Sequence, residues 1–218
     1  MHFLSHYYVD RSKNNPLFVL GALLPDIAPQ FTKTYNSKIR YKEWEMPDDI
    51  RSIHLGVLRH YQVDAVFHNS PVFKDACKNA GECMTNEGLD REKYRFWFLS
   101  HIASELILDF TLIADDPKLV TDYYNVLISV DTNKLSAYLN YIVSEDEKTK
   151  ILTNFMRFID VRFLRYFDKI DGVAEGITRT AHRAIGVTFT DIDRRRLIAA
   201  LHNIGNDIRY RSEKLLEV

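Results

Sequence analysis

Hydrophobic residues recur at helical spacing along most of this chain, and no segment shows the alternation of a half-buried strand. Two short apolar segments come first, at residues 3–9 and 16–24. Because proline lacks the backbone N–H that a helix interior needs, Pro25 is predicted to end the second segment and to leave Asp26 at its end. Residues 30–47 are polar and are predicted to form a long loop.

The rest of the chain predicts a series of capped helices. Asp48 or Asp49 is a suitable cap for a helix that runs to about His68, and Pro71 starts a shorter helix that ends near Gly81. The elements expected after it are a turn at 84–90, a long helix capped by Asp90 that runs to about Ala114 before Asp115-Asp116-Pro117, and helices at 117–129, 131–143, 145–168, 170–185 and 190–216. Ser144 to Glu147 has the sequence of a capping box. The fold class expected is all-α, as a single-domain multi-helix bundle over residues 1–218.

Composition agrees with a globular protein and narrows its partners. Of 218 residues, 46% are hydrophobic and 27% charged, and the net charge of -1 exerts no overall attraction toward nucleic acid or membrane. Cys77 and Cys83 match no zinc motif and are expected to be free thiols. The N-terminus lacks the features of a signal peptide, and the apolar run at 17–24 is too short to span a bilayer. We therefore expect a cytoplasmic protein without a membrane span.

Two predicted helices carry metal-ligand side chains at every fourth residue. An α-helix turns 100° per residue, so each four-residue step advances only about 40° around the axis and places these side chains on one face. The two sets are His60, Asp64 and His68 in the first helix, and His101, Glu105 and Asp109 in the second. Imidazole and carboxylate are ligands for zinc, manganese and iron, so two such faces predict an inter-helix metal site.

The surroundings of these residues strengthen the metal interpretation. The second helix is apolar nearly all round, so it is expected to be buried, and burying its ionisable groups without partners would cost about several kcal/mol. The alternative is a buried histidine–carboxylate hydrogen-bond network without metal. His54 is a weaker candidate, because it lies about 120° away from the face that carries His60.

Three segments together resemble a known family. Residues 1–6 (MHFLSH), residues 20–26 (LGALLPD) and the His60-x-x-x-Asp64 motif resemble the acyl carrier protein phosphodiesterases, distant relatives of HD-type metal phosphohydrolases. The same residues, with the later His101-x-x-x-Glu105, also resemble the helical zinc-dependent phospholipase C and nuclease group. The resemblance covers residues 1 to about 110. The first family usually carries Asp where this chain has His68, and the second group usually exposes a tryptophan N-terminus after signal cleavage.

These resemblances imply hydrolysis of a phosphodiester with the help of one or two divalent metal ions (Mn, Zn or Fe). The ligands implied are His6, Asp26, His60, Asp64, His68, His101 and Glu105. Asp64 is suited to bridge two ions, because a carboxylate has two oxygens to share. Catalytic roles are expected for Asp64, Glu105 and Asp109, the last as a ligand or as an acceptor that orients a histidine N–H.

Several basic residues are candidates for substrate binding. Arg59 neighbours His60 and is expected to face substrate phosphate, unless it forms an ordinary salt bridge. Arg179, His182 and Arg183 share a helical face that would suit the strongly acidic acyl carrier protein as partner. The alternative for this face is solvated surface with partners such as Glu175. Nucleic acid is an unlikely partner at this net charge.

Two other functions fit the same residues less well. The first is a non-catalytic helical binding module that retains the scaffold, favoured by the histidine at position 68 and by the second half of the chain, which resembles nothing specific. The second is an iron protein that handles oxygen. Di-iron sites typically use a Glu-x-x-His spacing, which the two faces do not show.

Overall fold

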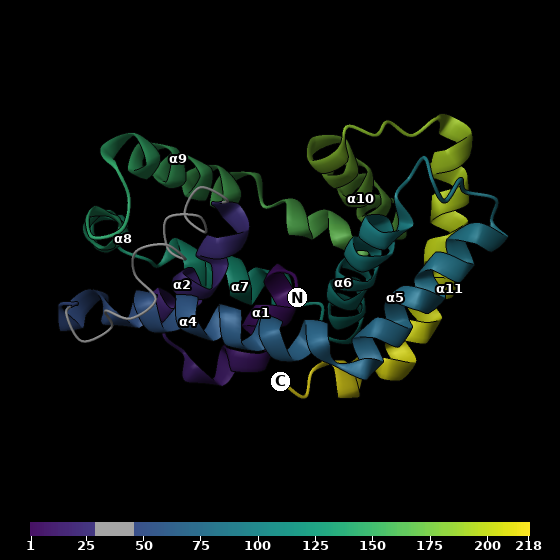
Figure 1. Cartoon of the computed structure of the whole chain (residues 1–218). Helices are drawn as coiled ribbons and strands as arrows, with labels where there is room; N and C mark the ends of the chain where they lie inside the picture. Colours follow the sequence, from purple (N-terminus) through teal and green to yellow (C-terminus); the bar gives the residue numbers. More distant parts are fainter. Residues whose placement is uncertain (29–45) are drawn as a thin grey trace. The chain divides into compact units, whose positions relative to one another are not determined.

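The structure, a computed structural model, describes residues 1–28 and 46–218, and every regular element in these ranges is helical (Figure 1). The helices are α1 (Phe3–Asp10), α2 (Pro16–Ile27), α4 (Asp48–Asn69), α5 (Pro71–Asn86), α6 (Phe96–Asp115), α7 (Leu119–Ile128), α8 (Thr132–Asn140), α9 (Glu145–Val161), α10 (Ile170–Ile185) and α11 (Asp191–Leu215). Short 3-10 turns follow α1 at Arg11–Lys13 and α9 at Phe163–Asp168. The all-α prediction is confirmed. The predicted loop at 30–47 lies outside the described residues, apart from its last two.

The chain divides into two compact units. One unit contains residues 1–5, 65–119 and 164–218, and the other contains residues 6–64 and 120–163. Each unit therefore combines segments that are distant in the sequence. The expectation of one domain over the whole chain stays a prediction.

Helix α6 forms the core of the first unit. It packs against α5, α10 and α11, which hold it among their apolar faces. Within the described part of the chain it is the one helix long and apolar enough to cross a membrane, and 72% of that apolar window is buried inside the protein. Its apolar character is therefore accounted for by its place in the core.

In the second unit, two glycines let α2 and α4 cross closely. A Cβ atom on Gly21 would overlap the carbonyl group of Ile53, and one on Gly56 would overlap the carbonyl of Phe18. Both helices meet backbone to backbone at this point, where only hydrogen fits. The crossing fixes the α2 segment that carries Asp26 against the α4 segment that carries His60.

Two predicted helix ends are wrong because the breaking residue is tolerated. Helix α2 continues through Pro25 to Ile27. Pro25 lies in the last turn, so the helix loses only the hydrogen bond that its N–H would have donated to Gly21. Helix α5 continues past Gly81 to Asn86, and the buried Gly81 lies against the ring of Phe96.

Two other predicted boundaries differ for conformational reasons. Asp90 caps a turn rather than α6, because its carboxylate accepts the N–H groups of Glu92 and Lys93, and α6 begins only at Phe96. The predicted helix at 145–168 is interrupted, since Arg162 adopts a left-handed conformation with φ 49°. The capping box at the start of α9 is confirmed.

We expect Gly56→Ala to lower the free energy of unfolding by about 1–3 kcal/mol or more, because the added methyl must push α2 and α4 apart. Gly205→Ala in α11 is the matched control. Nothing lies within 4 Å of its Cβ position, so the better helix propensity of alanine should stabilise the protein by about 1 kcal/mol. Urea unfolding measures both values, and a neutral Gly56→Ala would contradict the close crossing.

Candidate metal centre

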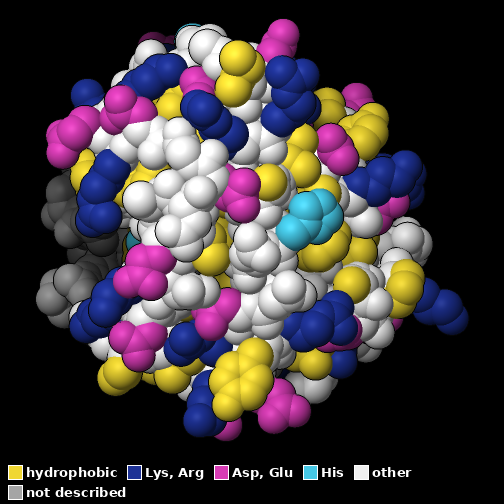
Figure 2. Space-filling model, turned by 90° about the vertical axis from the view of Figure 1, so that its right-hand side faces the viewer, with side chains coloured by type: hydrophobic (Ala, Val, Ile, Leu, Met, Phe, Trp, Pro, Cys, Tyr) yellow, Lys and Arg dark blue, Asp and Glu magenta, His cyan; other side chains and the backbone are white. Residues whose placement is uncertain are grey.

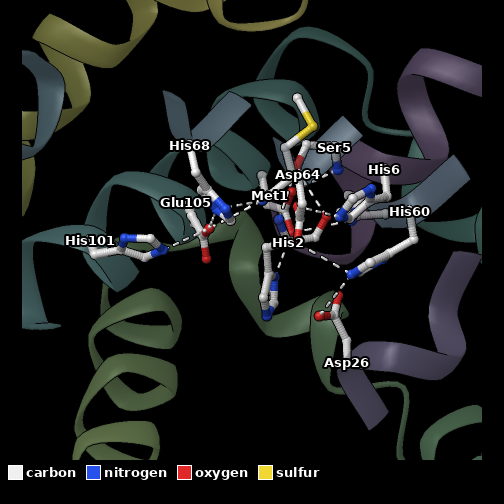
Figure 3. A network of polar contacts seen from close by, with 12 residues as sticks. Met1, His2, Ser5, His6, Asp26, His60, Asp64, His68, His101 and Glu105 are labelled. Carbon is white, nitrogen blue, oxygen red and sulfur yellow. Dashed lines mark hydrogen bonds and ion pairs between the residues drawn. The ribbon is translucent and has the colours of Figure 1, made fainter. Parts of the chain in front are cut away.

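Two groups of histidines and carboxylates could each hold a metal ion, one in each unit (Figure 3). We call the first the His60 cluster, which consists of His6, Asp26, His60 and Asp64. The second is the Glu105 cluster, which consists of His68, His101 and Glu105. Helix α4 supplies a histidine to each cluster.

The His60 cluster is built around a histidine with a fixed ring. Nδ1 of His60 lies 2.8 Å from the carbonyl oxygen of Ala22. A carbonyl only accepts hydrogen bonds, so Nδ1 must carry the proton, and in the neutral ring the lone pair is left on Nε2. That Nε2 lies 3.4 Å from Oδ2 of Asp64 and 3.9 Å from Oδ1 of Asp26. A backbone acceptor behind a histidine is the usual way in which proteins orient an imidazole toward a metal.

His6 presents a buried nitrogen to the same cluster. Its ring stacks on that of His60 with centroids 4.1 Å apart. Nε2 of His6 lies 3.2 Å from Oδ1 of Asp64, yet it is buried and forms no hydrogen bond of normal geometry within the described residues. Burial and the neighbouring His60 lower the pKa of His6 below its ordinary value. A neutral, buried imidazole nitrogen without a hydrogen bond is a suitable metal donor.

The two carboxylates set the charge of this cluster. Burial lowers the pKa of His60, but Asp26 and Asp64 outweigh this effect and raise it above its ordinary value. Burial would raise the pKa of Asp64, but its contacts with His6 and His60 hold the pKa far below the usual range. Asp64 is therefore ionised at neutral pH, as a ligand must be.

The spacing of the donors fits a small metal ion. Donor atoms of His6, Asp26 and His60 lie within 4.8 Å of one another. Zinc binds nitrogen and oxygen at about 2.0–2.2 Å, so two ligands of a tetrahedral zinc lie about 3.3 Å apart. The separations from Asp64 to the two histidines, 3.2 and 3.4 Å, agree with that distance.

The Glu105 cluster converges on one carboxylate oxygen. Nε2 of His68 lies 2.9 Å and Nε2 of His101 lies 3.1 Å from Oε1 of Glu105, and the amino group of Met1 lies 3.1 Å from the same atom. Burial would raise the pKa of Glu105, but the Met1 amino group and the two histidines hold it well below its usual range. Glu105 is thus a buried anion whose partners are metal-ligand side chains.

Phe73 supports the two imidazoles of this cluster. Its ring centroid lies 5.4 Å from that of His68 and 5.0 Å from that of His101. Phe73 is buried, whereas the side chains of His68 and His101 are 33% and 37% exposed. The Glu105 cluster therefore has a buried carboxylate and a solvent-facing pair of histidines.

A scan against protein-family models matches residues 2–171 to the zinc-dependent phospholipase C family. The chain belongs to this family. The family is a group of zinc-dependent phosphoester hydrolases. The match extends beyond residues 1–110, which carry the sequence resemblance. The resemblance to acyl carrier protein phosphodiesterases is not confirmed. Searches of curated proteins and of solved structures find no match.

Asp109 is the third ligand-type residue on the face of α6 that carries His101 and Glu105. It contacts the start of α1 and belongs to neither cluster. It is fully buried, and its carboxylate accepts the N–H groups of Leu4 and Ser5 at 3.2 and 2.8 Å. Nδ1 of His2 lies 2.7 Å from it. Asp109 thus holds the first turn of α1, and its catalytic role stays a prediction.

Two of the arginines predicted to bind phosphate, Arg59 and Arg179, each pair with a carboxylate. Arg59 donates a hydrogen bond to the carboxylate of Asp10 at 2.8 Å. It therefore forms the salt bridge that was the alternative to phosphate binding. On α10, Arg179 pairs with Glu175, which also binds Arg194. Figure 2 shows basic and acidic side chains interspersed on the face over α5 and α11 rather than one field of a single sign.

Two further α10 residues were predicted to bind substrate. His182 and Arg183 are exposed, and in the described part of the chain α10 supplies no residue to either cluster. Their substrate role stays a prediction.

Two contacts around these sites were not predicted from the sequence. The carbonyl of Ala22 carries no sequence signal, since every residue has one. The contacts of Asp109 with His2 and the α1 backbone depend on tertiary structure. His54, the weaker candidate, is buried and lies 3.4 Å from the hydroxyl of Tyr138, outside the cluster.

We expect the protein to bind about two zinc ions per chain, one in each cluster. His60→Gln and Glu105→Gln should each lose about one ion, because each removes a central ligand. His202→Gln, which changes an exposed histidine on α11, should keep both. Elemental analysis after dialysis against limiting zinc measures the content, and full zinc in both cluster variants would contradict this assignment.

Zinc should stabilise the protein more at high pH. The raised pKa of His60 keeps its ring protonated over a wider pH range, and zinc must displace that proton. The charged ring stabilises the zinc-free fold below the ordinary histidine pKa, and this contribution disappears as pH rises through the raised pKa. We expect the zinc-induced increase in Tm to be larger at about pH 8 than at about pH 6. Equal increases at both values would show that no histidine proton is displaced.

Proposed function

We propose that this protein is a zinc-dependent phosphodiesterase that hydrolyses a phospholipid-type phosphodiester. The observation that carries the proposal is the His60 cluster, in which a buried imidazole nitrogen without a hydrogen bond faces two carboxylates. The family match supports zinc as the metal and a phosphoester as the substrate.

The residues of the two clusters would hold the metal ions and fix their surroundings. His6, Asp26, His60 and Asp64 would bind one ion, and His68, His101 and Glu105 a second. When bound, zinc polarises a phosphoryl oxygen and lowers the pKa of a coordinated water toward neutrality. Ala22 keeps the proton of His60 on Nδ1, so Nε2 remains the donor throughout.

Partial exposure of the carboxylates supports access for substrate. Side chains of Asp26 and Asp64 are each 25% exposed, whereas those of His6 and His60 are nearly buried. A substrate phosphate or a water molecule can therefore approach from the carboxylate side of this cluster, while the histidines stay in the core. Ionised Asp64 is the group on that side best placed to accept a hydrogen bond from water.

Acyl carrier protein has less support as the substrate. The basic face proposed for it on α10 is partly neutralised by Glu175. It remains a useful comparison substrate, since its phosphopantetheine link is also a phosphodiester.

The zinc-loaded protein should release diacylglycerol from phosphatidylcholine in mixed micelles. Asp64→Asn should lower kcat by about 10²–10³-fold, because it removes a charge beside the metal, while His202→Gln should have no effect. Product release is measured by chromatography in parallel with zinc content. Chelator should abolish the activity, and zinc should restore it.

Acyl carrier protein and a soluble aryl phosphodiester should be assayed beside the lipid, with manganese and iron beside zinc. Cleavage of the carrier protein alone would replace the lipid substrate. Zinc binding without hydrolysis of any phosphodiester would leave the non-catalytic binding module. A visible absorption band only after iron loading would favour the iron protein.

A further inference from the structure

His2 and Asp109 form a hydrogen-bonded pair outside both metal clusters. Nδ1 of His2 lies 2.7 Å from Oδ2 of Asp109, whose side chain is fully buried. The two oxygens of Asp109 also accept the backbone N–H groups of Leu4 and Ser5. Because Asp109 uses both oxygens as acceptors, the proton of its hydrogen bond with His2 belongs to Nδ1 of the ring. Nε2 is therefore the ring nitrogen that is suited to give or take a proton.

Aromatic rings and a backbone contact hold His2 in place. Its ring centroid lies 4.2 Å from that of Phe3, edge to face, and 6.1 Å from that of Phe167, where the two rings are stacked. The backbone N–H of His2 donates to Oγ of Ser5 at 3.2 Å, and this hydroxyl donates to the carbonyl of His2 at 3.0 Å. The side chain of His2 is 18% exposed. The ring is thus fixed in orientation but still reached by solvent.

His2 lies beside the Glu105 cluster (Figure 3). Asp109 follows Glu105 by four residues, so the two carboxylates lie about one turn apart on one face of α6. Met1, the residue before His2, has its amino group 3.1 Å from Oε1 of Glu105 and 3.2 Å from Nε2 of His68. Among the described residues, the group that could share a metal ion here does not include His2. His2 is therefore a neighbour of this cluster and not one of its ligands.

We propose that His2, oriented by Asp109, is the general acid that protonates the leaving oxygen of a phosphodiester bound at the Glu105 cluster. This inference rests on the proposed function, because it assigns a residue to that reaction. A carboxylate behind a histidine fixes the tautomer of the ring and stabilises the ring when it carries two protons. The alkoxide that leaves a phospholipid is a strong base, so it leaves phosphorus slowly unless a positioned group protonates it.

The step exchanges one bond at phosphorus and transfers one proton. The oxygen of a water molecule forms the new bond to phosphorus, the bond from phosphorus to the leaving oxygen breaks, and its electron pair stays on that oxygen. Nε2 of His2 gives its proton to the leaving oxygen. The ring then becomes neutral and keeps its other proton on Nδ1, beside Asp109. The proton that the attacking water loses passes to solvent, from which His2 is protonated again.

Nuclear magnetic resonance tests the pair without requiring turnover. The nitrogen-15 shifts of an imidazole report which ring nitrogen carries a proton. We expect the ring of His2 in its neutral form to carry the proton on Nδ1, with the signal assigned by its absence from His2→Gln protein. Asp109→Asn should lose this signature, because an amide group can donate to Nδ1 and hold the wrong tautomer. A neutral wild-type ring with its proton on Nε2 would overturn the proposal.

The dependence of the rate on the leaving group gives the second test. His2→Gln should lower kcat on phosphatidylcholine by about 10²-fold, which is a typical contribution of general acid catalysis. On a 4-nitrophenyl phosphodiester the loss should be about tenfold smaller, because nitrophenolate leaves without a proton. Asp109→Asn should show the same pattern. His202→Gln, the same substitution at an exposed histidine on α11, should match wild-type protein on both esters.

Zinc content is measured beside these rates, and each variant should keep its zinc. Equal losses on the two esters in His2→Gln would overturn the acid role, and loss of zinc would make His2 a ligand instead. No hydrolysis of either ester by wild-type protein would overturn the proposed function and the acid role with it. In that case the Nδ1 signature would still report whether His2 and Asp109 are paired.

Discussion

Two buried carboxylates, Glu105 and Asp109, inside the apolar helix α6 determine how the first unit is assembled. An unpaired charge at either position would cost about several kcal/mol, so each must be met by donors from elsewhere in the chain. Asp109 takes its donors from the backbone of Leu4 and Ser5. Glu105 takes them from two histidines and the amino group of Met1. The N-terminal segment is consequently held to α6 by charge rather than by apolar contact alone.

The two clusters differ in how completely their polar atoms find hydrogen-bond partners. Every ring nitrogen that faces Glu105 lies within hydrogen-bond distance of it. In the His60 cluster, Nε2 of His6 is buried without a hydrogen bond, and two carboxylates share two imidazoles. We therefore expect the His60 cluster to favour binding of a cation more strongly than the Glu105 cluster does. The glycine crossing of α2 and α4 contributes to this, because it keeps Asp26 close to His60.

Much of the fold and the outline of the site follow from periodicity. The helical repeat predicts the all-α class and most of the helices, and four-residue spacing places the ligand side chains on shared faces. Helix ends are less predictable, since Pro25 and Gly81 are tolerated where the sequence suggests a break, and Arg162 breaks a helix without a sequence signal. The partner of Asp109 could not be predicted either, because that contact joins residues more than a hundred positions apart.

The division of the chain also has a consequence for biosynthesis. The first unit needs residues 1–5, 65–119 and 164–218, and α6 packs on α11, near the end of the chain. On the ribosome, the apolar face of α6 emerges long before the helix that covers it. The apolar face of α6 must therefore stay protected from aggregation until α11 has been synthesised and can cover it.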